Sequence, residues 1–216
     1  ALQNIPVIFC VDRAGLVGED GATHQGVFDI AFLNAIPNLQ ILSPKDAIEL
    51  RNTLSTLQLD NKNPTVVRYP KGRSNQLNWQ LPFESLDFNK VENIRKGNTI
   101  AVFTTGTIYE TVLNCIEKLP NKELFSVFHF IQIKPFNKDY ISNVLKNHKE
   151  IIVVEEGSII GGFGSVISQY VTELHPNVKV TCLGVPDVFI EHATVLEQQE
   201  ICGFSENKLN DFFSKY

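Results

Sequence analysis

Short apolar runs alternate with amphipathic stretches through the first third of the chain. Residues 5–11 form an uninterrupted apolar run, which predicts a strand covered on both faces, as in a parallel sheet. Further strands are predicted at 39–42 and 64–69. Helices are expected at 27–35 and at 43–57, the second with Ser43 as its N-cap. This strand–helix alternation predicts a parallel sheet with right-handed crossovers.

The same alternation returns in the second half of the chain. Apolar segments predict strands at 99–104, 124–130, 150–154 and 178–183. Helical patterns occur at 108–118, 138–146 and 164–174, with one or two more helices after Thr194. The predicted fold class is therefore α/β, with two open, mostly parallel sheets.

A stretch without sustained periodicity separates these halves. We expect one domain at 1–72, a linker at 73–96 anchored through Trp79, Leu81 and Phe83, and a second domain at 97–216. The chain opens almost directly into an apolar strand and contains no Met, even at position 1. We therefore expect it to be a fragment of a longer protein.

Composition narrows the possible functions. Of 216 residues, 20% are charged and the net charge is −5, which argues against a nucleic-acid-binding surface. No apolar run approaches the roughly 18 residues that span a bilayer. The four cysteines form neither a CxxC pair nor a zinc-type pattern, and no signal peptide is recognisable. These features favour a chain with reduced cysteines in the cytoplasm, without a membrane partner.

The densest group of polar residues lies in the glycine-rich loop at 12–26, directly after a predicted strand. Open α/β sheets bind ligands at the carboxyl ends of their strands. Asp20 and His24 are four residues apart around a glycine turn, so their side chains can converge as a pair for proton transfer near neutral pH. The alternative is a solvated glycine-rich loop that only caps the next helix.

A second motif, Arg68-Tyr69-Pro70-Lys71-Gly72, follows another predicted strand. Arg13 and Lys71 would then come from neighbouring strand ends into one crevice. Two cations there suit an anionic substrate, most simply a phosphate. The alternative is an ordinary strand end with surface charges.

Two glycine-containing motifs lie in the second half. Residues 155–165 include Gly162 and Gly164 before a helix, yet lack a dinucleotide fingerprint and a Walker A loop. Adjacent Glu155 and Glu156 would repel a phosphate, so we expect close packing against a neighbouring domain or subunit. His192, in the loop at 184–192, could line an interface or the edge of a site, and the alternative is a purely structural histidine.

Together these motifs resemble the transketolase-like thiamine diphosphate enzymes. The run from Asp12 to Gly15, then Gly18-Glu19-Asp20-Gly21 and Thr23-His24-Gln25-Gly26, is similar to their pyrimidine-binding domain. Residues 68–72, 155–164 and 184–192 point to the 1-deoxy-D-xylulose-5-phosphate synthase branch. The resemblance covers nearly the whole chain, as the last part of a pyrimidine-binding domain followed by a C-terminal domain.

The resemblance implies roles for four residues. Asp20 and His24 fall on positions beside the reacting end of the cofactor, where they steer substrate and protons. Arg13 and Lys71 fall where the family binds the phosphate of glyceraldehyde 3-phosphate. The second of these positions is often Arg in the family, so Lys71 keeps the charge but loses the bidentate guanidinium fork.

The resemblance also implies a parent enzyme larger than this chain. That parent would be a transferase that decarboxylates pyruvate and joins it to glyceraldehyde 3-phosphate, the first step of the methylerythritol phosphate route to isoprenoids. It would use thiamine diphosphate and Mg²⁺, whose ligands lie largely outside this chain, and would form a homodimer in the cytoplasm or a plastid-type stroma. The chain alone is therefore expected to be inactive.

Three alternatives stay open at the level of sequence. The chain could belong to a transketolase or to the β-component of a 2-oxoacid dehydrogenase. It could also be a non-catalytic assembly module built on a transketolase-like half.

Overall fold

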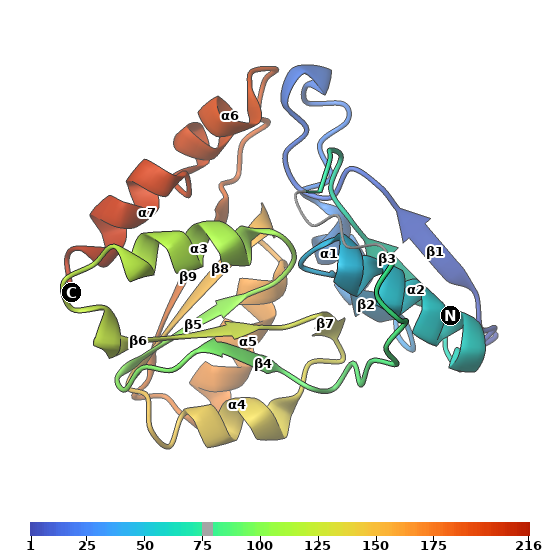
Figure 1. Ribbon diagram of the computed structural model, residues 1–216, viewed down its shortest axis with the longest axis horizontal. Helices are drawn as coiled ribbons and strands as arrows, with labels where there is room; N and C mark the ends of the chain where they lie inside the picture. Colours follow the sequence, from blue (N-terminus) through green and yellow to red (C-terminus); the bar gives the residue numbers. More distant parts are fainter. Residues whose placement is uncertain (75–79) are drawn as a thin grey trace.

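Two sheets lie side by side in the computed structural model, which describes residues 1–74 and 80–216 (Figure 1). Trp79 and the other residues of 75–79 fall outside the described part. The first sheet has the order β1-β3-β2-β7, and the second has the order β4-β6-β5-β8-β9. The predicted α/β fold with two mostly parallel sheets is confirmed, because only β7 and β4 run antiparallel to their neighbours.

The first sheet contains three parallel strands from the first half of the chain: β1 (Ile8–Val11), β3 (Thr65–Arg68) and β2 (Gln40–Leu42). Its helices are α1 (Asp29–Asn34) and α2 (Ala47–Asp60). The expected N-cap at Ser43 is wrong. Asp46 caps α2 instead, since its side chain accepts a hydrogen bond from the Glu49 amide at 2.8 Å.

β1 differs from the sequence expectation in its burial. Phe9 is half exposed and Cys10 is exposed, so β1 is not covered on both faces. β1 is an edge strand of this sheet, paired only with β3 among the described residues. Its apolar character therefore reflects surface that this chain leaves uncovered.

The second sheet is built from β4 (Glu92–Arg95), β6 (Phe125–His129), β5 (Ile100–Thr104), β8 (Glu150–Ser158) and β9 (Lys179–Val185). β5 and β6 are buried along their whole length, as expected for strands covered by helices on both faces. Along β5, Val102 packs with α3 (Ile108–Glu117) and α7 (Glu206–Phe213). The next residue, Phe103, packs with α4 (Lys138–Val144) and α5 (Phe163–Leu174) on the opposite face.

The first and second halves of the chain contact each other directly and are not connected only by a linker. β4 lies within the segment 73–96 that was expected to be a linker, so the second sheet begins before residue 97. β7 (Gln132–Lys134) comes from the second half yet pairs with β2 of the first sheet. The Ser158 amide also donates to the Val27 carbonyl at 2.7 Å. The two sheets therefore form one interlocked structure.

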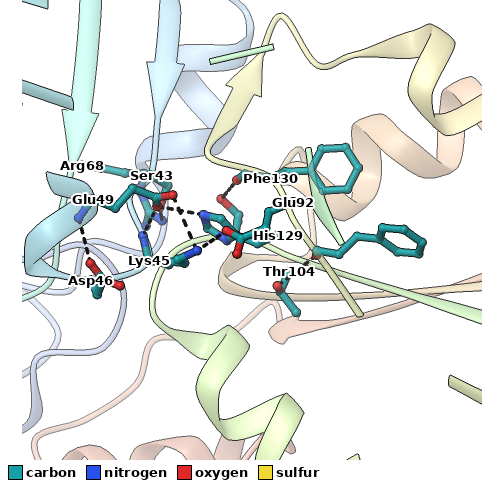
Figure 2. Close-up of polar contacts among 11 residues, drawn as sticks. Ser43, Lys45, Asp46, Glu49, Arg68, Glu92, Thr104, His129 and Phe130 are labelled. Atoms are coloured by element: carbon teal, nitrogen blue, oxygen red, sulfur yellow. Dashed lines mark hydrogen bonds and ion pairs between the residues drawn. The ribbon is translucent and has the colours of Figure 1, made fainter. Parts of the chain in front are cut away.

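Polar side chains reinforce this junction (Figure 2). His129 of β6 is buried and places its Nε2 3.0 Å from the Glu49 carboxylate of α2. Burial raises the pKa of Glu49, but the hydrogen bonds from His129 and the Lys45 amide outweigh it and lower the pKa overall. The Lys45 ammonium pairs with Glu92 of β4. Polar and charged side chains of the two halves thus pair with one another across the junction.

Candidate functional site

The site begins where β1 and β3 end side by side. Val11 pairs with Arg68 in the parallel ladder, and the Ala14 amide donates to the Tyr69 carbonyl at 2.9 Å beyond it. Arg13 and Lys71 follow these two strand ends. Because neighbouring parallel strands end at one edge of a sheet, both cations are expected at the same edge.

The loop after β1 closes on itself through its glycines. Gly15 and Gly26 exchange backbone hydrogen bonds of 2.8 and 2.9 Å. A Cβ on Gly26 would lie only 2.0 Å from the Arg13 carbonyl oxygen, so no other residue fits there without moving the loop. Arg13 itself has a φ of 60°, a left-handed conformation that is uncommon for a non-glycine residue. Close contact between the loop ends therefore fixes the backbone from which the Arg13 side chain projects.

Asp20 holds the two cations together. Its Oδ2 lies 2.6 Å from Lys71 Nζ and 3.5 Å from Arg13 Nε. The hydrogen bond from Lys71 lowers the pKa of Asp20, helped by Arg13, so the carboxylate is ionised at neutral pH. Arg13 also donates to Asp12 at 2.8 Å. The result is a partly exposed cluster of two cations, Arg13 and Lys71, and two carboxylates, Asp12 and Asp20.

His24 does not join this cluster. Its Nδ1 lies 3.0 Å from the Thr23 hydroxyl, and its ring is exposed. Within the described residues, no hydrogen bond or ion pair links Asp20 to His24. The expected Asp20–His24 pairing is therefore absent, because the Lys71 ammonium is a stronger partner for the carboxylate. The imidazole is left accessible on the same loop.

A cavity of about 520 Å³ opens next to Lys71, between the two halves. Tyr69 and Arg73 line it from the first half, and Thr107 and Tyr109 line it from the second. Its mixed polar and aromatic walls could surround a small polar substrate.

Arg68, in the motif at 68–72, has a different role from its neighbour Lys71. Its side chain is buried and forms a two-pronged ion pair with buried Asp29, at 2.8 and 3.2 Å. It also donates to the carbonyls of Gly26 and Glu156 at 3.2 and 3.3 Å. From the sequence, this motif was interpreted either as a substrate-binding site or as an exposed strand end. The buried ion pair of Arg68 was not predicted. The signal was the position of Arg68 directly after the apolar residues Val66 and Val67 of β3.

The glycines at 157–164 surround a carboxylate that belongs to the chain. Buried Glu155 accepts hydrogen bonds from the amides of Phe163 and Gly164, at 2.9 and 2.7 Å, at the start of α5. A Cβ on Gly162 would lie 2.6 Å from a Glu155 oxygen. Burial raises the pKa of Glu155 to about 7, although these amides oppose the shift. This helix start is therefore filled by Glu155, and Gly161 nearby packs against Ala31 of α1 in the other half.

His192 lies at the edge of the site rather than in the charged cluster. A Cβ on Gly21 would lie 3.4 Å from the His192 Cβ, so the loop at 184–192 packs directly against the glycine-rich loop. The expectation of an interface position agrees with this contact.

Comparison with known proteins assigns these features to a family. Residues 89–209 match the transketolase C-terminal domain, and residues 1–76 match the transketolase pyrimidine-binding domain. A 1-deoxy-D-xylulose-5-phosphate synthase of Bacteroides fragilis is 39% identical over 100% of this chain and 34% of its own length. That of Bacteroides thetaiotaomicron is 38% identical over 97% of this chain and 33% of its own length. The chain thus spans about a third of the length of these curated relatives.

A solved structure agrees in fold. A split-gene transketolase, described as an inactive β4 tetramer, superposes with a TM-score of 0.84 at 22% identity, covering 99% of this chain and 68% of its own. None of the helices in the described part of the chain is long and apolar enough to cross a membrane. Because the two family matches together cover most of the chain, the chain belongs to the transketolase family, with part of a pyrimidine-binding domain followed by a C-terminal domain.

Proposed function

We propose that this chain is the acceptor-binding portion of a 1-deoxy-D-xylulose-5-phosphate synthase. The parent enzyme joins pyruvate to glyceraldehyde 3-phosphate and releases carbon dioxide, at the start of a route to isoprenoids. The observation that carries the proposal is the convergence of Arg13 and Lys71 on Asp20, beside a cavity of about 520 Å³.

The guanidinium of Arg13 and the ammonium of Lys71 can both donate hydrogen bonds to a phosphate monoester. The monoester carries a charge of about −1.5 to −2 at neutral pH and offers three acceptor oxygens. Arg13 and Lys71 are partly exposed, with side-chain exposures of 41% and 51%, so an anion from solution can reach them. Asp20 pairs with both cations, and its lowered pKa makes it a poor proton donor. We therefore assign positioning to Asp20 and phosphate binding to Arg13 and Lys71.

His24 is the proposed proton carrier. When the new carbon–carbon bond forms, the aldehyde oxygen of the acceptor becomes a hydroxyl and needs a proton. The Thr23 contact engages only Nδ1, so among the described contacts Nε2 is left for a substrate group. An exposed imidazole on a substrate-side loop suits this transfer near neutral pH.

The cofactor belongs to the rest of the parent. Thiamine diphosphate supplies the electron sink for such a carboligation. Among the described residues, no three His, Cys, Asp or Glu side chains are arranged to hold a metal ion. Buried Glu155 occupies the glycine-lined helix start that resembled a phosphate site. Since the chain spans about a third of the length of its relatives, we propose that the diphosphate and Mg²⁺ ligands lie in other domains of the parent, which would be a cytoplasmic homodimer.

The test is an assay of the full-length protein with thiamine diphosphate and Mg²⁺. We expect carbon dioxide release that requires both pyruvate and glyceraldehyde 3-phosphate, with 1-deoxy-D-xylulose 5-phosphate as product. Two-carbon transfer from a ketose phosphate to an aldose phosphate, without carbon dioxide, would indicate a transketolase instead. No turnover with either substrate pair would favour a non-catalytic assembly module.

Calorimetric titration of the 216-residue chain with thiamine diphosphate and Mg²⁺ addresses its incompleteness. We expect no tight binding and no turnover by the chain alone. Micromolar binding would contradict the assignment of the cofactor ligands to other parts of the parent.

A further inference from the structure

The 3₁₀ turn Gly18–Asp20, which ends with Asp20, packs against the C-terminal half of the chain. A Cβ on Gly18 would lie 3.3 Å from the Ala193 carbonyl oxygen, and Gly21 packs against His192. Glycine is favoured at both positions because φ is 68° and 74°, and at Gly18 the facing backbone is also close. The turn is therefore fitted against the segment that leads into α6 (Val195–Cys202).

Gln198 of α6 makes side-chain hydrogen bonds to this turn. Its side chain is fully buried, and its Oε1 accepts a hydrogen bond from the Gly18 amide at 2.8 Å. Its Nε2 donates to the Gly18 carbonyl at 3.0 Å and to the Glu191 carbonyl at 2.8 Å. One amide side chain thus satisfies both backbone groups of Gly18 and ties the turn to the loop before α6.

We infer that Gln198 is a positioning residue for acceptor binding in the proposed reaction. Asp20 follows Gly18 by two residues, and its carboxylate holds Lys71 at 2.6 Å and Arg13 at 3.5 Å. Fixing the Gly18 peptide therefore fixes the anion around which the two cations gather. The C-terminal domain, which places no charged group in this cluster among the described residues, sets its geometry through a neutral amide. This inference rests on the proposed function of the Arg13–Lys71 cluster.

Gln198→Met isolates this contribution because methionine has similar length and volume but cannot replace the three hydrogen bonds. Without these three hydrogen bonds, the turn becomes more mobile, and the side chains of Asp20, Arg13 and Lys71 are held less precisely. Binding of the acceptor phosphate should weaken, whereas an acceptor without phosphate should be affected little. Gln169→Met is the matched control, because Gln169 is an exposed glutamine on α5 of the same domain.

The experiment measures kcat/KM of the full-length enzyme for glyceraldehyde 3-phosphate and for D-glyceraldehyde. The ratio of the two is independent of the fraction of enzyme that folds, so a destabilised variant still gives an answer. We expect Gln198→Met to lower the ratio at least about fivefold and Gln169→Met to leave it unchanged. Amide hydrogen exchange should show faster exchange at Gly18 in Gln198→Met, with the amides of β5 unaffected.

Arg13→Gln separates failure of this inference from failure of the proposed function. If Arg13→Gln lowers the ratio and Gln198→Met does not, the positioning role of Gln198 is overturned while the phosphate site stands. If neither variant changes the ratio, the phosphate site is overturned, and the inference with it. If Gln198→Met yields too little folded enzyme to assay, the shorter Gln198→Asn is measured against the same criteria.

Discussion

The buried ion pair between Arg68 and Asp29 should dominate the stability of the junction around the site. Arg68 ends β3, and Asp29 begins α1. Their side chains are 2% and 8% exposed. Arg68 also reaches the carbonyls of Gly26 and Glu156, so it joins the site loop to the second half of the chain. Arg68→Met removes the cation while keeping much of the side-chain length.

The expected cost follows from the partner that is left behind. Removing one member of a buried pair leaves an uncompensated charge and costs about 3–5 kcal/mol. In a protein of this size, each kcal/mol corresponds to about 2–4 °C in Tm. Arg68→Met should therefore lower Tm by about 6–20 °C. Lys62→Met, which breaks an exposed pair with Asp60, should have almost no effect.

Differential scanning calorimetry in low salt and in 0.5 M NaCl provides the measurement. The loss in Arg68→Met should persist in high salt, because buried pairs are screened little. The double variant Arg68→Met with Asp29→Asn should be more stable than Arg68→Met alone, since it removes the stranded carboxylate. A Tm drop below 2 °C, or a double variant no better than the single one, would refute this explanation.

The loop, the proton carrier and the buried carboxylate can be tested separately. Gly26→Ala should open the loop, because its methyl group would lie 2.0 Å from the Arg13 carbonyl; limited proteolysis between residues 12 and 26 measures this, and an unchanged cleavage rate would contradict it. In the full-length enzyme His24→Ala should lower kcat at least about tenfold, and His192→Ala much less; a lower Tm with unchanged kcat would show instead that His24 is structural. Burial raises the pKa of Glu155 from 4.5 to about 7, so folding takes up a proton and stability falls as pH rises through this window, by about 3 kcal/mol. Denaturant titrations between pH 4.5 and 7.5 should show this fall in the native protein relative to Glu155→Gln, and parallel pH profiles would argue against it.

Much of the fold follows from apolar periodicity, but elements that depend on distant partners do not. β5 and β8 are recognisable because each contains an uninterrupted apolar stretch, at 100–103 and at 151–154. β4 and β7 are short and rich in polar residues, and they form strands only because β6 and β2 offer an open edge. Local sequence carries no sign of that pairing.

The candidate site was predictable in position but not in its internal pairing. Parallel strands end at one edge, so Arg13 and Lys71 could be placed together from sequence. The spacing of Asp20 and His24 allowed them to converge, yet the tertiary fold brings Lys71 closer to Asp20. The hydrogen bond between Gln198 and Gly18 joins residues 180 positions apart in the sequence, and no local sequence pattern predicts it.

The phosphate dependence of the acceptor is the most direct test of the proposed site. KM for glyceraldehyde 3-phosphate and for D-glyceraldehyde should be measured in the full-length enzyme and in Lys71→Gln, with Lys62→Gln as the control at an exposed lysine. We predict that Lys71→Gln raises KM for the phosphorylated acceptor at least about tenfold, the scale of one charge-assisted hydrogen bond. KM for D-glyceraldehyde should stay within about twofold of the native value. Equal changes for both acceptors, or no change for either, would contradict the assignment of Lys71 to the substrate phosphate.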